Sequence, residues 1–177
     1  MTPIEIALVL LLVHGALGAV DTFYNHEWKE RLPSRPEAAR ELALHSLRSA
    51  LFVVMFLGLA WFEWGGGWAW AALGLIAAEY LVTLADSVVE DRTRVLGPVE
   101  RVNHMLLGLN TGLYCAFVAV QAIRWAEQPS ALVRTHYPWL SELLTACALV
   151  IAVWVVRDGA AARREARAAA EARLHLA

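Results

Sequence analysis

Carboxylate and imidazole side chains gather at the ends of the apolar segments of this chain. The stretch from residue 79 to residue 104 places six of them at or near the ends of two strongly apolar segments. Ionisable side chains are costly inside a membrane, where they usually face the interior of a helical bundle or a wet cavity. We therefore treat them as candidates for a functional site. They are Glu79, Asp86, Glu90, Asp91, Glu100 and His104.

A weak internal repeat relates these residues to an earlier part of the chain. Asp21-Thr22 corresponds to Asp86-Ser87, and the segment Glu41-x-x-x-His45 corresponds to Glu100-x-x-x-His104. Residues four apart share one face of an α-helix, so each Glu-x-x-x-His segment can present a carboxylate and an imidazole to one centre. Parallel repeats are known in membrane folds, where sites form at the repeat interface. Counted in helical turns, seven residues fall at similar depth: Asp21, Glu41, His45, Asp86, Glu90, Glu100 and His104.

These side chains favour a metal centre. Carboxylates crowded at one depth repel each other unless they are protonated or neutralised, and a divalent ion supplies both charge and coordination. Carboxylate-rich sites with a few imidazoles suit iron or manganese, whereas zinc usually takes fewer ligands with more His or Cys. We expect two ions, iron first, with manganese or zinc as alternatives. The predicted metal-ligating residues are Asp21, His26, Glu41, His45, Asp86, Glu90, Glu100 and His104.

Glu79 and Asp91 are the predicted catalytic residues, and Glu79 is a candidate proton carrier. Glu79 and His14 lie roughly 10 Å deeper than Asp86 and Asp21, at about 1.5 Å of rise per residue. A buried hydrogen-bonded pair between Glu79 and His14 is the preferred interpretation of these two residues.

Several candidates have structural interpretations as well. Glu residues in a first turn complement the helix dipole. Asp86 and Glu90 could form salt bridges with Arg48, Arg92 or Arg94. His26 is expected on the loop side of the first span, where it either completes the site or is solvated. Asn110 is expected to make an interhelical hydrogen bond, and His136 and His175 to be exposed.

The elements that must position these residues are membrane spans. The chain has 177 residues, 59% of them hydrophobic, and a mean hydropathy of +0.48. This favours an all-α integral membrane helical bundle with five transmembrane helices. The first four form a pseudo-twofold bundle of two hairpins, residues 4–64 and 68–126, and a fifth span covers 139–156. One membrane domain, 1–157, precedes an Ala- and Arg-rich cytoplasmic tail, 158–177.

The positive residues predict the orientation of the spans. Lys29, Arg31, Arg35 and the arginines of 92–101 and 157–167 fall on one side, so the N-terminus is expected outside and the C-terminus in the cytoplasm. A belt of tryptophans then marks the outer interface. These residues are Trp61, Trp64, Trp68, Trp125 and Trp139. The expected location is the bacterial inner membrane, with several passes.

Composition also excludes some classes of function. The net charge is −2 and no basic block is interleaved with aromatic residues, so nucleic acid is not expected as a partner. Cys115 and Cys147 lie within apolar runs and indicate neither a disulfide framework nor a CxxC metal site. The first apolar run lacks the positive start of a secretory signal, which favours an uncleaved span.

Residues 10–115 resemble a family of small bacterial integral membrane proteins. The resemblance is carried by H-G-x-L-G-x-x-D, which ends at Asp21, by Asn25-His26-Glu27, and by the segments E-L-x-L-H, E-D-R-T-R and E-R-V-N-H. It covers the first four spans and leaves out the fifth. The family has no established activity, so the resemblance implies a membrane fold and supplies no mechanism.

The expected function is that of a membrane oxidoreductase with a dinuclear iron centre, acting on a lipid or another apolar substrate. A redox partner and a homo-oligomer are compatible with this prediction. One alternative is a transporter driven by protons or a divalent cation, although the outer half of the bundle looks apolar and sealed. Others are a zinc-dependent lipid hydrolase, a b-type haem carrier using His45 and His104, and a purely structural polar network.

Overall fold

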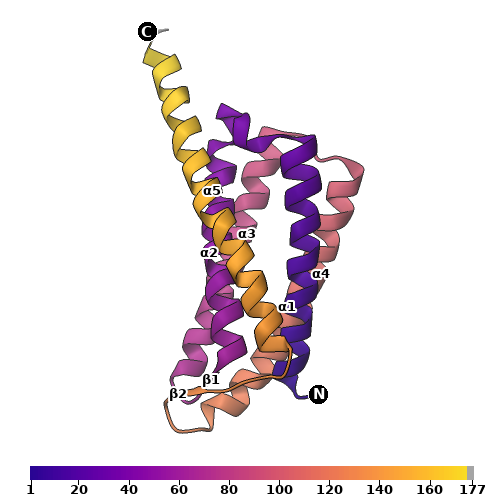
Figure 1. The fold of residues 1–177 in the computed structure, drawn as a ribbon, viewed down its shortest axis with the longest axis vertical. Coiled ribbons are helices and arrows are strands. Elements are labelled where there is room, and N and C mark those ends of the chain that lie inside the picture. The colour runs from indigo at the N-terminus through magenta and orange to yellow at the C-terminus, as the bar shows by residue number, and fades with distance from the viewer. Residues whose placement is uncertain (175–177) are drawn as a thin grey trace.

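The computed structural model describes residues 1–174, most of which lie in five long helices (Figure 1). They are α1 (Pro3–Val20), α2 (Ala39–Trp61), α3 (Trp68–Thr93), α4 (Pro98–Ala126) and α5 (Leu140–Leu174). A π-helix, Asp21–Lys29, continues α1, and two short 3-10 helices, Leu32–Ser34 and Pro36–Ala38, lead into α2. The prediction for His175 lies outside the described residues.

The five long helices have the length and apolar composition of membrane spans. Their most apolar windows have mean hydropathies between 1.6 and 2.0. Large apolar side chains such as Trp70, Leu109 and Val153 point outward and are exposed. A helix satisfies its own backbone hydrogen bonds, so such a surface is compatible with lipid. The predicted helical bundle is confirmed to the extent that its five helices are long and apolar enough to span a membrane.

The helices pack around one large hydrophobic core, and a smaller buried cluster lies between α2, α5 and the 3-10 helices. α1 packs against α4, α2 packs against α3, and α5 lies along α2 (Figure 1). The largest fully buried side chains of the core include Phe56, Leu11, Tyr114 and Trp125. The sequence analysis placed a fifth span at 139–156 and a tail at 158–177. In the structure, α5 is a single helix of 35 residues that covers both regions as far as Leu174, packs against the bundle and extends beyond it.

A small antiparallel sheet closes the end of the bundle opposite to the C-terminus. β1 (Phe62–Trp64) pairs with β2 (Leu132–Arg134), with Phe62 opposite Arg134. The sequence analysis did not predict these strands, which are only three residues long. β1 falls at the end of the predicted first hairpin, 4–64, and β2 falls between the predicted second hairpin and the fifth span. The sheet joins the α2–α3 connection to the α4–α5 connection and so holds these two connections together.

Replacing Gly66 with alanine is expected to destabilise the protein. Gly66 has a φ of +59°, and a Cβ there would lie 2.6 Å from the Cα of Ser130. The left-handed conformation alone costs an alanine about 1–2 kcal/mol, and the backbone contact adds to that. Thermal unfolding in detergent should show a lower midpoint for Gly66→Ala. Gly74→Ala is the control, because a Cβ at Gly74 meets nothing within 4 Å, and an unchanged Gly66→Ala midpoint would contradict this prediction.

Candidate functional site

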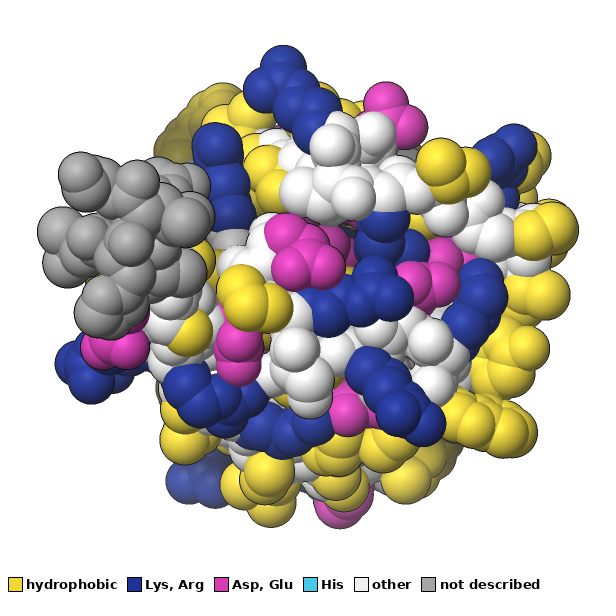
Figure 2. All heavy atoms as spheres, turned by 90° about the horizontal axis from the view of Figure 1, so that it is seen from above, with side chains coloured by type: hydrophobic (Ala, Val, Ile, Leu, Met, Phe, Trp, Pro, Cys, Tyr) yellow, Lys and Arg dark blue, Asp and Glu magenta, His cyan; other side chains and the backbone are white. Residues whose placement is uncertain are grey.

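The eight predicted metal-ligating residues lie together at one end of the bundle, which we call the charged end. Figure 2 looks onto this end, where Lys and Arg side chains surround a smaller group of Asp and Glu side chains. Hydrophobic side chains form the outer rim in the same view. Seven of the eight residues are buried, and the side chain of His104 is 27% exposed. The seven are Asp21, His26, Glu41, His45, Asp86, Glu90 and Glu100.

His26 reaches the cluster because the backbone changes from an α-helix to a π-helix at Asp21. In an α-helix, a side chain five residues after Asp21 would point about 140° away from it. A π-helix closes hydrogen bonds between residues five apart, and therefore brings residues 21 and 26 to one face. His26 Nε2 lies 3.6 Å from Asp21 Oδ2. The alternative that His26 is solvated is therefore wrong, since its side chain is buried within a helical segment at the loop-side end of the first span.

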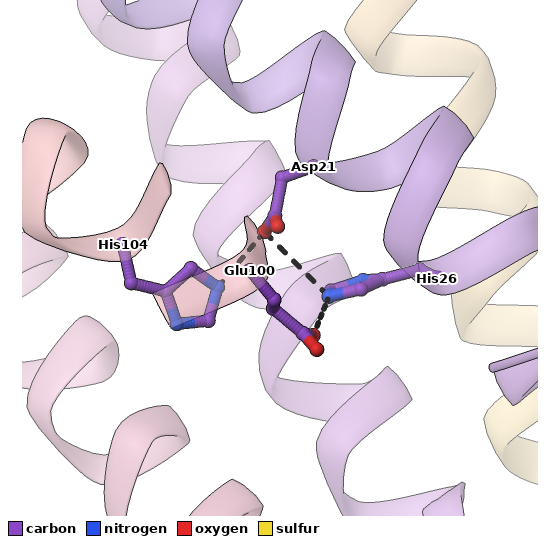
Figure 3. A group of neighbouring side chains, drawn as sticks. All are labelled: Asp21, His26, Glu100 and His104. Carbon is purple, nitrogen blue, oxygen red and sulfur yellow. Dashed lines mark hydrogen bonds and ion pairs between the residues drawn. The ribbon is translucent and has the colours of Figure 1, made fainter. Parts of the chain in front are cut away.

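Asp21, His26, Glu100 and His104 converge on one point between the π-helix and α4, as Figure 3 shows. His104 Nε2 lies 3.1 Å from Asp21 Oδ2, and His26 Nε2 lies 3.8 Å from Glu100 Oε1. One ligand-type atom from each of the four residues lies within 4.8 Å of the others. Two carboxylates and two imidazoles at this spacing could coordinate one divalent ion.

Several atoms that face this point have no hydrogen-bond partner among the described residues. His26 Nε2 and Glu100 Oε2 are both buried and unpartnered, and so is Glu41 Oε2. Buried polar atoms are normally hydrogen-bonded, and an unpaired one carries a desolvation penalty. The carboxylate oxygen of Asp21 is better satisfied, because Asn25 Nδ2 donates a hydrogen bond of 2.8 Å to its Oδ1. The carboxylate oxygens therefore need a proton donor or a cation, and a cation could also be bound by the neutral His26 ring if its Nε2 is unprotonated.

A second contact mirrors the one between Asp21 and His104. His45 Nε2, on α2, lies 3.3 Å from Asp86 Oδ2, on α3. Asp86 and His45 are the residues that the predicted repeat equates with Asp21 and His104. In this half, however, an arginine joins the pair, because Arg48 Nη1 lies 3.2 Å from Asp86 Oδ2. The two halves thus have similar contacts but different counter-charges.

Arg94 lies among three carboxylates at the centre of the charged end. Its Nη2 lies 3.1 Å from Glu41 Oε1 and 2.6 Å from Glu100 Oε1, and it also contacts Glu90. Burial by itself lowers the pKa of an arginine, but contact with Glu100 and the charges of Glu41 and Glu90 raise the pKa of Arg94 above its ordinary value. Its guanidinium group is therefore a permanent cation inside the cluster.

A second group with metal-ligand spacing consists of His26, Glu41 and Glu90. It shares His26 with the first group, and one imidazole nitrogen has a single lone pair to donate. Arg94 contacts the two carboxylates of this second group. A second ion would therefore compete with Arg94 for Glu41 and Glu90.

The charges of the cluster do not balance. Five buried carboxylates face two guanidinium groups, an excess of three negative charges when every carboxylate is ionised and the imidazoles are neutral. Buried like charges are unfavourable unless protons or bound cations neutralise them. The carboxylates are those of Asp21, Glu41, Asp86, Glu90 and Glu100, and the arginines are Arg48 and Arg94.

The two predicted catalytic residues lie outside the cluster. Asp91 is exposed, one residue beyond the buried Glu90 on α3, so the structure does not place it in the site. Glu79 is buried deeper in the bundle and accepts hydrogen bonds from the hydroxyls of Tyr114 (2.9 Å) and Thr83 (2.7 Å). The preferred pairing of Glu79 with His14 is therefore wrong. The partner of His14 is Asn110.

An apolar cavity of about 500 Å³, which we call the chamber, runs from the cluster into the bundle. Its polar end is lined by His45, Asp86, Glu90 and His104. Helices α1, α2, α3, α4 and α5 all contribute to its walls, mainly with aromatic and aliphatic side chains and glycines. The volume is within the range of about 300–1,000 Å³ that is typical of ligand pockets.

α5 contributes two residues from the boundary at 157–158, where the sequence analysis ended the membrane domain and began the tail. Asp158 is buried and lines the chamber. The neighbouring Arg157 pairs with Glu27 of the π-helix, and one of its contacts, between Nη2 and Oε2, measures 2.5 Å. No signal in the sequence identifies these two residues as part of the site, because an Arg-Asp pair at the end of an apolar run usually indicates the start of a solvated segment.

No family model, no curated protein and no solved structure matches this chain.

Proposed function

We propose that the chain is a membrane metalloprotein whose ion is held by Asp21, His26, Glu100 and His104, and that it performs redox chemistry on a lipid or another apolar molecule. The observation that carries the proposal is that the apolar chamber ends at this ligand-type cluster, with His104 belonging to both. An ion bound there would meet a molecule that enters from the bilayer. Iron is the first choice for two carboxylates and two imidazoles, with manganese or zinc as alternatives.

The number of ions in this proposal depends on Arg94. The first group supplies four ligand-type side chains. Arg94 contacts Oε1 of Glu100 in this group but leaves its Oε2 without a partner among the described residues. The second group shares His26 and has both of its carboxylates in contact with Arg94. We propose one ion in the first group, and a second, as in a dinuclear centre, only when Arg94 withdraws from Glu41 and Glu90. Soluble di-iron bundles likewise combine carboxylates and imidazoles from four helices.

We further propose that the charged end faces the cytoplasm of a bacterial cell. The positive residues around this end favour that orientation by the positive-inside rule. The matched contacts of Asp21 with His104 and of Asp86 with His45 agree with a pseudo-twofold repeat of two hairpins. Glu79 remains a candidate proton carrier, because it is a buried carboxylate hydrogen-bonded to Thr83, which lines the chamber.

The metal content of the purified protein tests the proposal. Wild-type protein is expected to hold about one divalent ion per chain by mass spectrometry of the metals. Glu100→Gln and His104→Ala should lose the ion, because each variant removes a ligand. Removal of an outer-shell partner alone typically reduces metal affinity by about 10–100-fold. His136→Ala is the matched control, since His136 lies on the α4–α5 connection and pairs with Glu142 at its surface.

An absorbance spectrum of the same samples separates the alternatives. A Soret band lost in His104→Ala would indicate a b-type haem instead of a carboxylate-bound ion. Well-folded wild-type protein that binds no metal from a buffer containing iron, manganese and zinc would overturn the proposal. It would leave proton transport or a structural polar network as the function of the cluster.

A further inference from the structure

The deep end of the chamber has a polar group that the metal proposal does not use. His14, on α1, lines the chamber, and its ring stacks against Phe52 with centroids 4.8 Å apart. It also meets the ring of Tyr114 edge to face at 5.5 Å. An imidazole in an otherwise apolar wall is costly unless its nitrogens have partners.

The contacts of Asn110 determine which nitrogen of His14 carries the proton. Asn110 Nδ2 donates to the backbone oxygen of Leu10 at 3.0 Å, which fixes the orientation of the amide, because its oxygen would be repelled there. The same Nδ2 lies 3.3 Å from His14 Nδ1. Since Nδ2 is a donor, Nδ1 must be the acceptor, and the proton of the neutral ring is on Nε2.

The Nε2–H group has no hydrogen-bond partner among the described residues. The chamber lining also contains hydroxyl groups, such as those of Ser49 and Thr111, which can turn to donate or to accept. The hydroxyls of Tyr114 and Thr83 already donate to Glu79. The neutral ring of His14 therefore presents a fixed donor to the chamber. The other donor-only side chains of the lining are Arg48, which pairs with Asp86, and Trp154, whose indole N–H has no partner among the described residues.

We infer that His14 is the anchoring residue for a carbonyl oxygen of the chamber's ligand, which is an apolar molecule bearing a ketone or quinone-type carbonyl. The carbonyl would accept a hydrogen bond from Nε2, while the apolar remainder fills the chamber toward the metal cluster. A pure hydrocarbon would leave Nε2–H without a hydrogen-bond acceptor. The chamber should therefore bind a carbonyl compound more tightly than the matching hydrocarbon. The inference rests on the proposed function only in taking the chamber as the substrate site.

Two fluorine-labelled probes test this inference on metal-free protein, so that the result does not depend on the ion. One is a fluorophenyl alkyl ketone and the other is the alkylbenzene in which a methylene replaces the carbonyl. Fluorine NMR titration in detergent should show that wild-type protein binds the ketone about tenfold more tightly, as one net hydrogen bond provides. His14→Phe should remove this preference and keep the affinity for the alkylbenzene. Ser49→Ala, a chamber residue without a fixed donor, should keep it.

Nitrogen NMR of histidine-labelled protein gives a second readout. The His14 ring is expected as the neutral Nε2–H tautomer in the absence of probe. Equal affinity of wild-type protein for the two probes, a ketone preference that survives in His14→Phe, or a His14 ring protonated at Nδ1 would each overturn the inference. Addition of phospholipid distinguishes the source of the carbonyl ligand. If the ester carbonyls of the lipid compete for His14, ketone binding is abolished, and the ligand of the chamber is then a membrane lipid. The metal measurements on Glu100→Gln and His104→Ala are independent of all these outcomes.

Discussion

Replacing Arg94 with methionine is expected to destabilise the metal-free protein by about 3–5 kcal/mol, the typical cost of removing one partner from a buried ion pair. The side chain of Arg94 is 7% exposed, and three carboxylates depend on its charge. Without it, Glu41, Glu90 and Glu100 must take up protons or repel each other in a region of low polarity. Unfolding in mixed micelles with a chelator present should measure the loss.

Arg92→Met is the matched control for this variant. Arg92 lies two residues earlier in α3 and is exposed, so the same substitution removes a charge without leaving a buried carboxylate unpaired. It should change the unfolding free energy by less than about 0.5 kcal/mol, as surface substitutions usually do. Metal-free Arg94→Met protein as stable as Arg92→Met would show that the carboxylates do not need the guanidinium group.

Arg94→Met should also change the response to metal. The variant frees Glu41 and Glu90, so that a divalent ion can take the place of the guanidinium group. Added iron or manganese should restore part of the lost stability, because a ligand that binds only the folded state stabilises it. The bound metal should rise from about one to about two ions per chain. Stability restored without a second ion would place the restoring ion in the first group alone.

The sequence predicts the helices of this fold well, because long apolar runs and their breakers depend on local composition. The predicted boundaries at residues 64, 68 and 126 lie within a few residues of the end of α2 at Trp61, the start of α3 at Trp68 and the end of α4 at Ala126. Hydropathy does not distinguish a lipid-facing helix from one that packs on a neighbour, so it could not show that α5 lies along α2. For the same reason hydropathy could not identify Asp158 as a chamber residue, because Asp158 reaches the chamber only through the packing of α5.

The candidate site is predictable where it depends on helical spacing. The repeat of an aspartate followed by Glu-x-x-x-His identified residues that the fold does bring together at one end. The position of His26 relative to Asp21 could not be predicted. An α-helical wheel directs its side chain away from Asp21, and nothing in the local sequence predicts a π-helix. Arg94 was foreseen only as one salt-bridge partner among several. Its position among three carboxylates depends on how α3 ends against α2 and α4.

Replacing His26 with phenylalanine is expected to reduce metal affinity by at least about 100-fold, since it removes a ligand and not merely an outer-shell partner, which itself costs about 10–100-fold. His26 belongs to both groups with metal-ligand spacing, and its Nε2 is buried without a hydrogen-bond partner in the described part of the chain. Competition with a chromogenic chelator measures the dissociation constant.

His45→Phe is the matched comparison, because it makes the same change at a neighbouring buried imidazole. The two rings lie 4.4 Å apart, yet His45 contacts Asp86 and Arg48 and belongs to neither group. It should therefore keep the first ion with an affinity within about tenfold of wild type, the lower end of the outer-shell range. Equal losses in the two variants would instead indicate that His45 is a ligand. The ion would then lie nearer to Asp86, between the two halves of the repeat.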